Sequence, residues 1–212
     1  MKHWHENGFT LIELMITLLV AAVIFGVGIP NFREFIANNR MATAANDFIS
    51  ALHIARSEAI KRRTNVSICP SANWDAANPT CNNGGRLGDG MIVFVDCSAA
   101  PPAPCGAPNL AVDGADQVIS ARGPLPNQIA NLFATDAGGV EYLTYGPNGF
   151  PRNVPGFNAG IRNIQLCDDR GDHDTGGGIA AGRWLQITPT GRPQIYRNQN
   201  FVQSANNPLN GC

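Results

Sequence analysis

The feature that most constrains this sequence is an apolar run near its N-terminus, from Phe9 to Ile29, in which Glu13 is the single charged residue. As an α-helix the run is roughly 31 Å long, which matches the hydrocarbon thickness of a bilayer. A secretory signal peptide would end in a small-residue cleavage site after such a run. None follows Ile29, where the chain continues into Pro30 and an amphipathic stretch. The run therefore predicts a membrane-inserted helix, and the simplest alternative is an uncleaved signal anchor.

The carboxylate of Glu13 argues against a plain anchor. An acidic side chain inside a membrane helix costs about 3 kcal/mol and is by default a functional group. Cleavage between Gly8 and Phe9 would create an α-amine close to Glu13 in sequence, and this amine could pair with Glu13 of a neighbouring helix. The predicted organisation is a polar leader (residues 1–8), a membrane and filament-core helix (9–30) and an exported head (31–212).

The segment Gly8-Phe9-Thr10-Leu11-Ile12-Glu13 resembles the processing signal of type IV pilins and pseudopilins. In that family a prepilin peptidase cuts after the glycine and N-methylates the new phenylalanine, and the glutamate promotes filament assembly. The resemblance implies these roles for Gly8, Phe9 and Glu13. It also implies that the protein lies in the bacterial inner membrane with a periplasmic head, and enters a pilus or pseudopilus with other pilins.

Beyond Pro30 the pattern predicts one helix to about Arg63, followed by strands. Apolar residues recur at helical spacing, namely Met41, Ala45, Phe48, Leu52, Ala55 and Ala59. Expected strands are Val66–Ile68, Met91–Val95, Val118–Ile119, Val140–Tyr145, Ile161–Leu166 and a hairpin of Trp184–Ile187 with Gln194–Tyr196. Expected loops are Pro70–Arg86, Ser98–Asn109 and Asp168–Gly182. The fold class is α+β, a long helix laid on an antiparallel sheet.

Phrases in the head resemble the GspH/FimT group of minor pilins. They are Ala55-Arg56-Ser57-Glu58-Ala59, Val66–Pro70, Gly90–Asp96, Cys167–Gly171, Thr190-Gly191-Arg192-Pro193 and Cys212, in this order. The resemblance implies a low-abundance subunit that primes, caps or decorates a type IV pilus. Alternatives are a minor pseudopilin of a type II secretion system and, as in some FimT-type members, a subunit for DNA uptake.

The even number of cysteines favours disulfides in an exported, loop-rich head. The sequence has six: Cys69, Cys81, Cys97, Cys105, Cys167 and Cys212. A zinc site is the alternative, but no C-x-x-C pair occurs and no histidine adjoins a cysteine. Six cysteines allow about 15 pairings. Loop closure favours Cys69–Cys81 and Cys97–Cys105, which leaves Cys167–Cys212 to hold the tail.

The C-terminal segment carries the candidate DNA site, because residues 175–212 contain Arg183, Arg192 and Arg197 and no acidic residue. The planar guanidinium group of arginine can form two hydrogen bonds with a phosphate, and Tyr196 offers a ring for base stacking. DNA-binding FimT-like proteins carry a Gly-Arg-x-Arg pattern, but Gln194 replaces the second arginine here. Positions 192 and 197 of a strand also point to opposite faces. Solvated arginines on an edge hairpin are the simpler interpretation.

The sequence gives little support for metal binding or for enzymatic activity. Four aspartates and a histidine lie close together in sequence: Asp168, Asp169, Asp172, His173 and Asp174. Such carboxylates could hold Ca²⁺ through oxygen ligands. Their spacing differs from the EF-hand pattern, so we prefer the interpretation of a solvated acidic loop. No G-x-S-x-G, P-loop or H-E-x-x-H motif occurs. The net charge of −1 gives no global attraction to nucleic acid. We predict no enzymatic activity, metal or cofactor. The predicted partners are other pilins, the prepilin peptidase, the inner membrane and, in the alternative function, DNA.

Overall fold

The computed structural model describes residues 8–98, 105–114, 116–126, 129–133 and 140–212. The chain divides into two compact units, Met1–Asn39 and Arg40–Cys212. Most of the predicted leader and part of the predicted loop Ser98–Asn109 lie outside the described residues.

Helix α1 (Leu11–Arg62) is the longest element and is continuous through Pro30. Its second part belongs to the head and buries the predicted apolar stripe, every member of which is at most 2% exposed. These side chains form one core with residues of two β-sheets, including Ile68 and Leu143 of the first and Ile164 and Leu185 of the second. The helical periodicity of the sequence thus predicted the head-packing face correctly, because a stripe of this kind must be covered.

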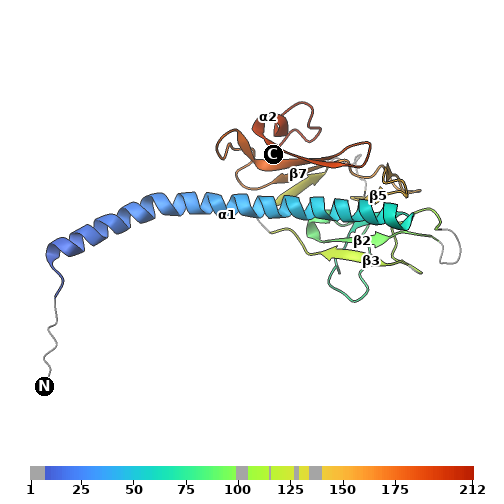
Figure 1. Cartoon of the computed structure of the whole chain (residues 1–212), viewed down its shortest axis with the longest axis horizontal. Helices are drawn as coiled ribbons and strands as arrows, with labels where there is room; N and C mark the ends of the chain where they lie inside the picture. Colours follow the sequence, from blue (N-terminus) through green and yellow to red (C-terminus); the bar gives the residue numbers. More distant parts are fainter. Residues whose placement is uncertain (1–7, 99–104, 115, 127–128, 134–139) are drawn as a thin grey trace, which may run out of the picture. The chain divides into compact units, whose positions relative to one another are not determined.

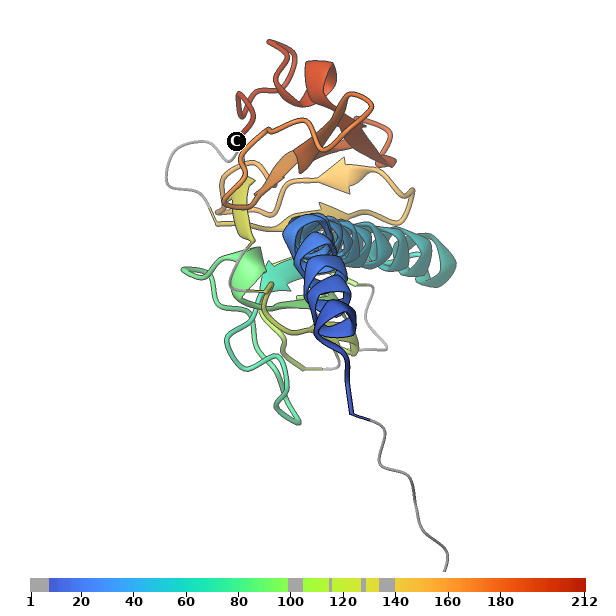
Figure 2. The ribbon, with the colours of Figure 1, turned by 90° about the vertical axis from the view of Figure 1, so that its left-hand side faces the viewer.

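The strands of the head form two antiparallel sheets. The five-stranded sheet has the order β3-β2-β1-β5-β6, with β1 Val66–Pro70, β2 Met91–Val95, β3 Val118–Arg122, β5 Leu143–Tyr145 and β6 Pro151–Arg152. The four-stranded sheet has the order β4-β7-β8-β9, with β4 Ala130–Phe133, β7 Asn163–Cys167, β8 Ile179–Ile187 and β9 Pro193–Asn198. Figures 1 and 2 both show the green strands of the first sheet and the orange strands of the second on different sides of α1. A 3₁₀ turn, η1 (Leu87–Asp89), and a short helix, α2 (Gln199–Val202), complete the head.

The fold class is the predicted α+β, but one expected sheet is in fact two. The predicted loop Asp168–Gly182 is wrong at its end, because β8 begins at Ile179. The residues that follow Ile179 are small and do not alternate with polar ones, yet Ala180 and Ala181 are fully buried. Covering by the rest of the head, and not the local pattern, therefore makes them a strand. The expected strand at Val140–Tyr145 shortens to β5. Strands β4 and β6 were not predicted; β6 contains a proline at a sheet edge, where it is tolerated.

Three disulfides join the predicted cysteine pairs: Cys69–Cys81, Cys97–Cys105 and Cys167–Cys212. The first two join cysteines that are 12 and 8 residues apart in sequence, with Cys69 in β1 and Cys97 shortly after β2. The third spans 45 residues and ties the end of β7 to the C-terminal residue. The predicted hairpin is also confirmed, since Trp184 pairs with Tyr196 and Gln186 with Gln194 across β8 and β9.

Candidate functional site: the N-terminal helix and the C-terminal segment

Helix α1 begins at Leu11, two residues after the predicted cleavage position between Gly8 and Phe9. The Thr10 hydroxyl accepts a hydrogen bond from the backbone N–H of Glu13 at 3.3 Å, and the Thr10 carbonyl accepts from Leu14 at 3.2 Å. Thr10 is therefore the N-cap and Glu13 occupies the third helical position, the pattern of a capping box. This capping role was not predicted above, although the sequence contains its signal, Thr-x-x-Glu. Glu13 thus lies where the helix dipole favours a negative charge.

The first part of α1 presents apolar side chains that the chain itself does not cover. Phe9, just before the helix, is 78% exposed, and Leu11 and Ile12 at its start are 76% and 67% exposed. An 18-residue window of the helix with mean hydropathy 2.5 is 0% buried. Covering one such side chain is worth about 2 kcal/mol, so this surface favours contact with lipid or with other apolar helices over contact with water. The polar Thr17 is satisfied within the helix, because its hydroxyl donates to the Leu14 carbonyl at 2.9 Å. Among the described residues, α1 is the one helix long and apolar enough to cross a membrane.

The arginines of the C-terminal segment are not equivalent. Arg183 is 6% exposed, and its guanidinium donates to the carbonyls of Ala180, Ala181 and Gly182. Burial lowers the pKa of Arg183. Arg183 is consequently part of the protein interior and does not add to a phosphate-binding surface, contrary to the prediction from charge alone.

Arg192 and Arg197 are exposed, whereas the predicted stacking residue is engaged elsewhere. The Tyr196 ring stacks on Trp184 with centroids 4.4 Å apart and also contacts Phe201 at 5.7 Å. Its hydroxyl donates to the Gln194 side chain at 2.9 Å. These contacts leave less of the ring for a nucleic-acid base. DNA contact through Arg192, Tyr196 and Arg197 stays a prediction.

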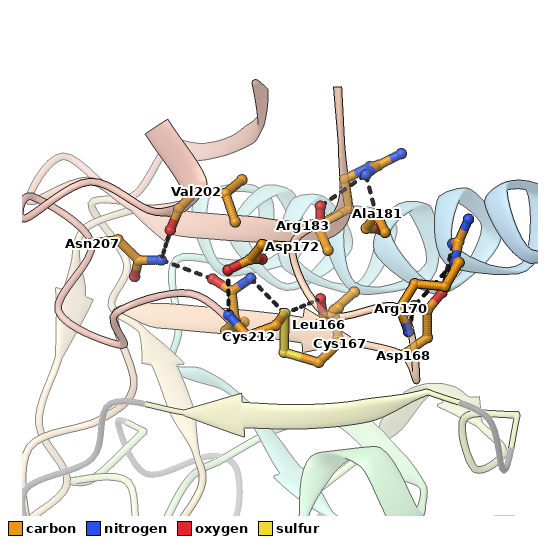
Figure 3. Close-up of a disulfide and its surroundings, with 12 residues drawn as sticks. Leu166, Cys167, Asp168, Arg170, Asp172, Ala181, Arg183, Val202, Asn207 and Cys212 are labelled. Atoms are coloured by element: carbon orange, nitrogen blue, oxygen red, sulfur yellow. Dashed lines mark hydrogen bonds and ion pairs between the residues drawn. A yellow bond between two sulfur atoms is a disulfide. The ribbon is translucent and has the colours of Figure 1, made fainter. Parts of the chain in front are cut away.

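Three of the acidic residues after β7 each have a separate structural task. Asp168 pairs with Arg170 at 2.6 Å, and Asp172 accepts a hydrogen bond from the Cys212 backbone N–H at 2.7 Å. Asp174 accepts from the Gly176 N–H at 2.8 Å. Figure 3 shows Asp172 beside the Cys167–Cys212 disulfide and Asp168 turned toward Arg170. Within the described residues no group of three or more His, Cys, Asp or Glu side chains is placed to hold a metal ion.

The sequence profile of the type II transport protein GspH matches residues 44–191, which include most of the head. The chain belongs to the GspH family. A prokaryotic N-terminal methylation motif matches residues 5–29, the segment that contains Gly8, Phe9 and Glu13. Family and motif together make the protein a minor pilin or pseudopilin, a structural subunit of a type IV pilus or a type II secretion system that is anchored by its apolar helix.

Two crystal forms of the type IV minor pilin FimU of Pseudomonas aeruginosa are similar to this GspH-family protein. The first is 22% identical with a TM-score of 0.45, and the match covers 76% of this chain and 92% of FimU. The second is 21% identical with a TM-score of 0.41, covering 73% and 91%. A sequence comparison with curated proteins finds no match.

Proposed function

We propose that this protein is a minor pilin cleaved between Gly8 and Phe9, whose helix α1 then enters a type IV pilus and whose head is displayed on the periplasmic side. The observation that carries the proposal is the uncovered apolar surface of α1 with Glu13 at its start. Such a surface is stable in the bilayer and equally stable against the helices of other pilins. The subunit would prime, cap or decorate the filament, and this role requires no catalytic residue.

The carboxylate of Glu13 supplies the specificity of assembly in this proposal. In an apolar environment a carboxylate requires an opposite charge. The α-amine of a processed Phe9 on a neighbouring subunit provides one at the same depth, because the two groups lie at the same end of the helix. The apolar run supplies affinity, and the ion pair fixes the axial register of one helix against the next.

A second candidate is a minor pseudopilin of a type II secretion system, which the description of the matching family favours. The two machines use the same helix chemistry and differ in where the subunit ends up. Under the pilus proposal the protein is recovered in sheared surface filaments. Under the alternative it stays with the cell envelope, and its deletion blocks the export of secreted proteins.

Glu13→Gln is expected to lower the amount of the protein in sheared filaments at least tenfold, with membrane insertion and cleavage unchanged. Glutamine can still serve at the third position of the capping box, so the substitution removes the charge and keeps the helix start. A loss of about 1.4 kcal/mol already gives a tenfold change. Immunoblots of filament and membrane fractions measure the effect.

The matched control is Thr10→Val, which removes the cap hydroxyl and retains the carboxylate. It is expected to leave filament recovery close to that of the parent. Equal recovery of Glu13→Gln and the parent would contradict the role proposed for the charge, and equal losses in both variants would assign the effect to the helix cap.

A further inference from the structure

A pocket of about 610 Å³ opens at the C-terminal end of α1 and has no part in the helix chemistry above. Its lining brings together three segments: residues 63–65 just after α1, residues 105–107 beginning at the disulfide-bonded Cys105, and Pro147 with Arg152 from the turn between β5 and β6 and from β6 itself. Two arginines line it, Arg63 and Arg152. A smaller hollow of about 410 Å³ adjoins it, because Pro147 and Arg152 line both, and Phe150 lines the second.

Arg63 is held in a backbone conformation that favours glycine. Its φ is 54°, and the backbone N–H of Thr64 returns to the Ala59 carbonyl at 3.2 Å, which closes the end of α1. Glycine is the usual residue at this position of a helix terminus. A strained non-glycine residue that persists in a structure points to a use for its side chain, and here the side chain faces a pocket.

The walls of the pocket are fixed by hydrogen bonds. Asn65 is 3% exposed; its side chain accepts from Arg152 at 2.8 Å and donates to the Gly106 carbonyl at 3.0 Å. The Thr64 hydroxyl contacts Cys97 and Cys105, the two sulfur atoms of the disulfide, at 3.0 and 2.7 Å. The Arg152 guanidinium is therefore oriented before any ligand arrives, which reduces the entropy lost on binding.

Neither arginine is neutralised within the described part of the chain. No described carboxylate forms an ion pair with Arg63 or Arg152. The acidic residue of the last helical turns, Glu58, is already engaged by Lys61 at 3.4 Å and by Arg62 at 2.6 Å. The negative end of the helix dipole partly offsets one positive charge here, and the second arginine leaves a net attraction for an anion.

The surroundings match a protein partner better than a nucleic acid. Phe150 and Ile60 remain 46% and 48% exposed, and an aromatic side chain beside arginines is typical of the residues that contribute most to protein interfaces. Binding of a nucleic-acid strand needs a basic groove along several phosphates. The neighbouring cations Lys61 and Arg62 are both paired with Glu58, so among the described residues they do not extend the two arginines of the pocket into a row of unpaired cations.

We infer that this pocket binds an acidic side chain of the head of a neighbouring pilin subunit, with Arg63 and Arg152 as the carboxylate ligands and Phe150 as the apolar rim. The inference rests on the proposed function, because the partner is another subunit of the same filament. It places a head-to-head contact at the end of α1, separate from the packing of the apolar helices.

The test is photo-crosslinking of the full chain in cells that assemble the filament, with p-benzoylphenylalanine at position 150. We expect a crosslink to another pilin, mapped by mass spectrometry to a peptide with Asp or Glu, and at least a tenfold loss in the Arg63→Gln, Arg152→Gln double variant. Lys61→Gln, which removes a paired cation, retains the crosslink. The same probe at Phe201, which is 53% exposed on α2, gives none that depends on these arginines.

Arg63→Gly separates binding from folding, because glycine relieves the backbone strain while removing the guanidinium. We expect an unchanged or raised Tm together with a weaker crosslink. A crosslink that survives the double variant, a crosslink to DNA, or no subunit crosslink in a protein recovered in filaments would overturn the inference. Absence of the parent protein from sheared filaments would instead refute the proposed function.

Discussion

Gly191→Ala is expected to lower the free energy of unfolding of the head by about 3 kcal/mol. Gly191 is buried with φ of +81°, and a Cβ there would collide with the Gly149 carbonyl oxygen and approach the Tyr145 ring to 3.0 Å. The substitution therefore combines backbone strain with overpacking. The turn between β8 and β9 that contains Gly191 also links the two sheets. The hydroxyl of Tyr145, in β5 of the five-stranded sheet, donates a hydrogen bond to the Gly191 carbonyl at 3.1 Å.

Arg56 adds to this connection, since its guanidinium donates to the carbonyls of Gly149 and Thr190 at 3.1 Å each. The matched control is Gly156→Ala, because Gly156 has nearly the same φ, +83°, with nothing within 4 Å of the added Cβ. We expect it to cost only about 1 kcal/mol. Urea unfolding of the full chain in detergent, followed by near-ultraviolet circular dichroism, measures both. Equal losses would show that the close approach at Gly191 contributes nothing.

Removal of the Cys167–Cys212 disulfide by serine substitution of both cysteines is expected to destabilise the head by about 4 kcal/mol. The chain-entropy relation gives this value for a closed loop of 45 residues. The disulfide also takes part in the hydrogen bonds that hold the segment after α2. The Gln165 side chain donates to the Cys212 sulfur at 3.3 Å and accepts from Asn207 at 2.9 Å. Without the bridge, we expect proteinase K to cleave between α2 and the C-terminus at least tenfold faster.

The Cys97–Cys105 pair is the control for this prediction, because it closes a loop of only 8 residues. The same relation gives roughly 2.5 kcal/mol for its removal, with no change in cleavage of the tail. An unaltered cleavage pattern in the Cys167, Cys212 double variant would mean that the hydrogen bonds of Asn207 and Asp172 hold the tail without the covalent link.

The sequence was informative where the signal is local. The helical stripe of α1 follows from a period of three to four residues, and the cysteine pairs follow from the low entropy cost of short loops. The β8–β9 hairpin was predictable because apolar runs flank a Thr-Gly turn. The methylation motif combines a glycine, an aromatic residue and one acid in an apolar run, and such a combination needs no tertiary information.

The remaining features depend on contacts between distant segments. Arg183 counts as a surface cation in the sequence, yet it is buried because its guanidinium meets three carbonyls of its own strand. The first half of β8 is a strand because the C-terminal segment covers it: Val202 of α2 packs with Ala180 in one apolar cluster. The sequence around Arg63 does not indicate its positive φ, because this conformation is imposed by the end of α1 and by the chain that follows at Asn65.

Mass spectrometry of the N-terminal peptide from membrane and filament fractions shows directly whether this GspH-family chain is processed as a pilin subunit. We expect a chain that begins at Phe9 with an N-methylated amine in both fractions. A chain that retains residues 1–8, or one that begins after Ile29, would contradict it.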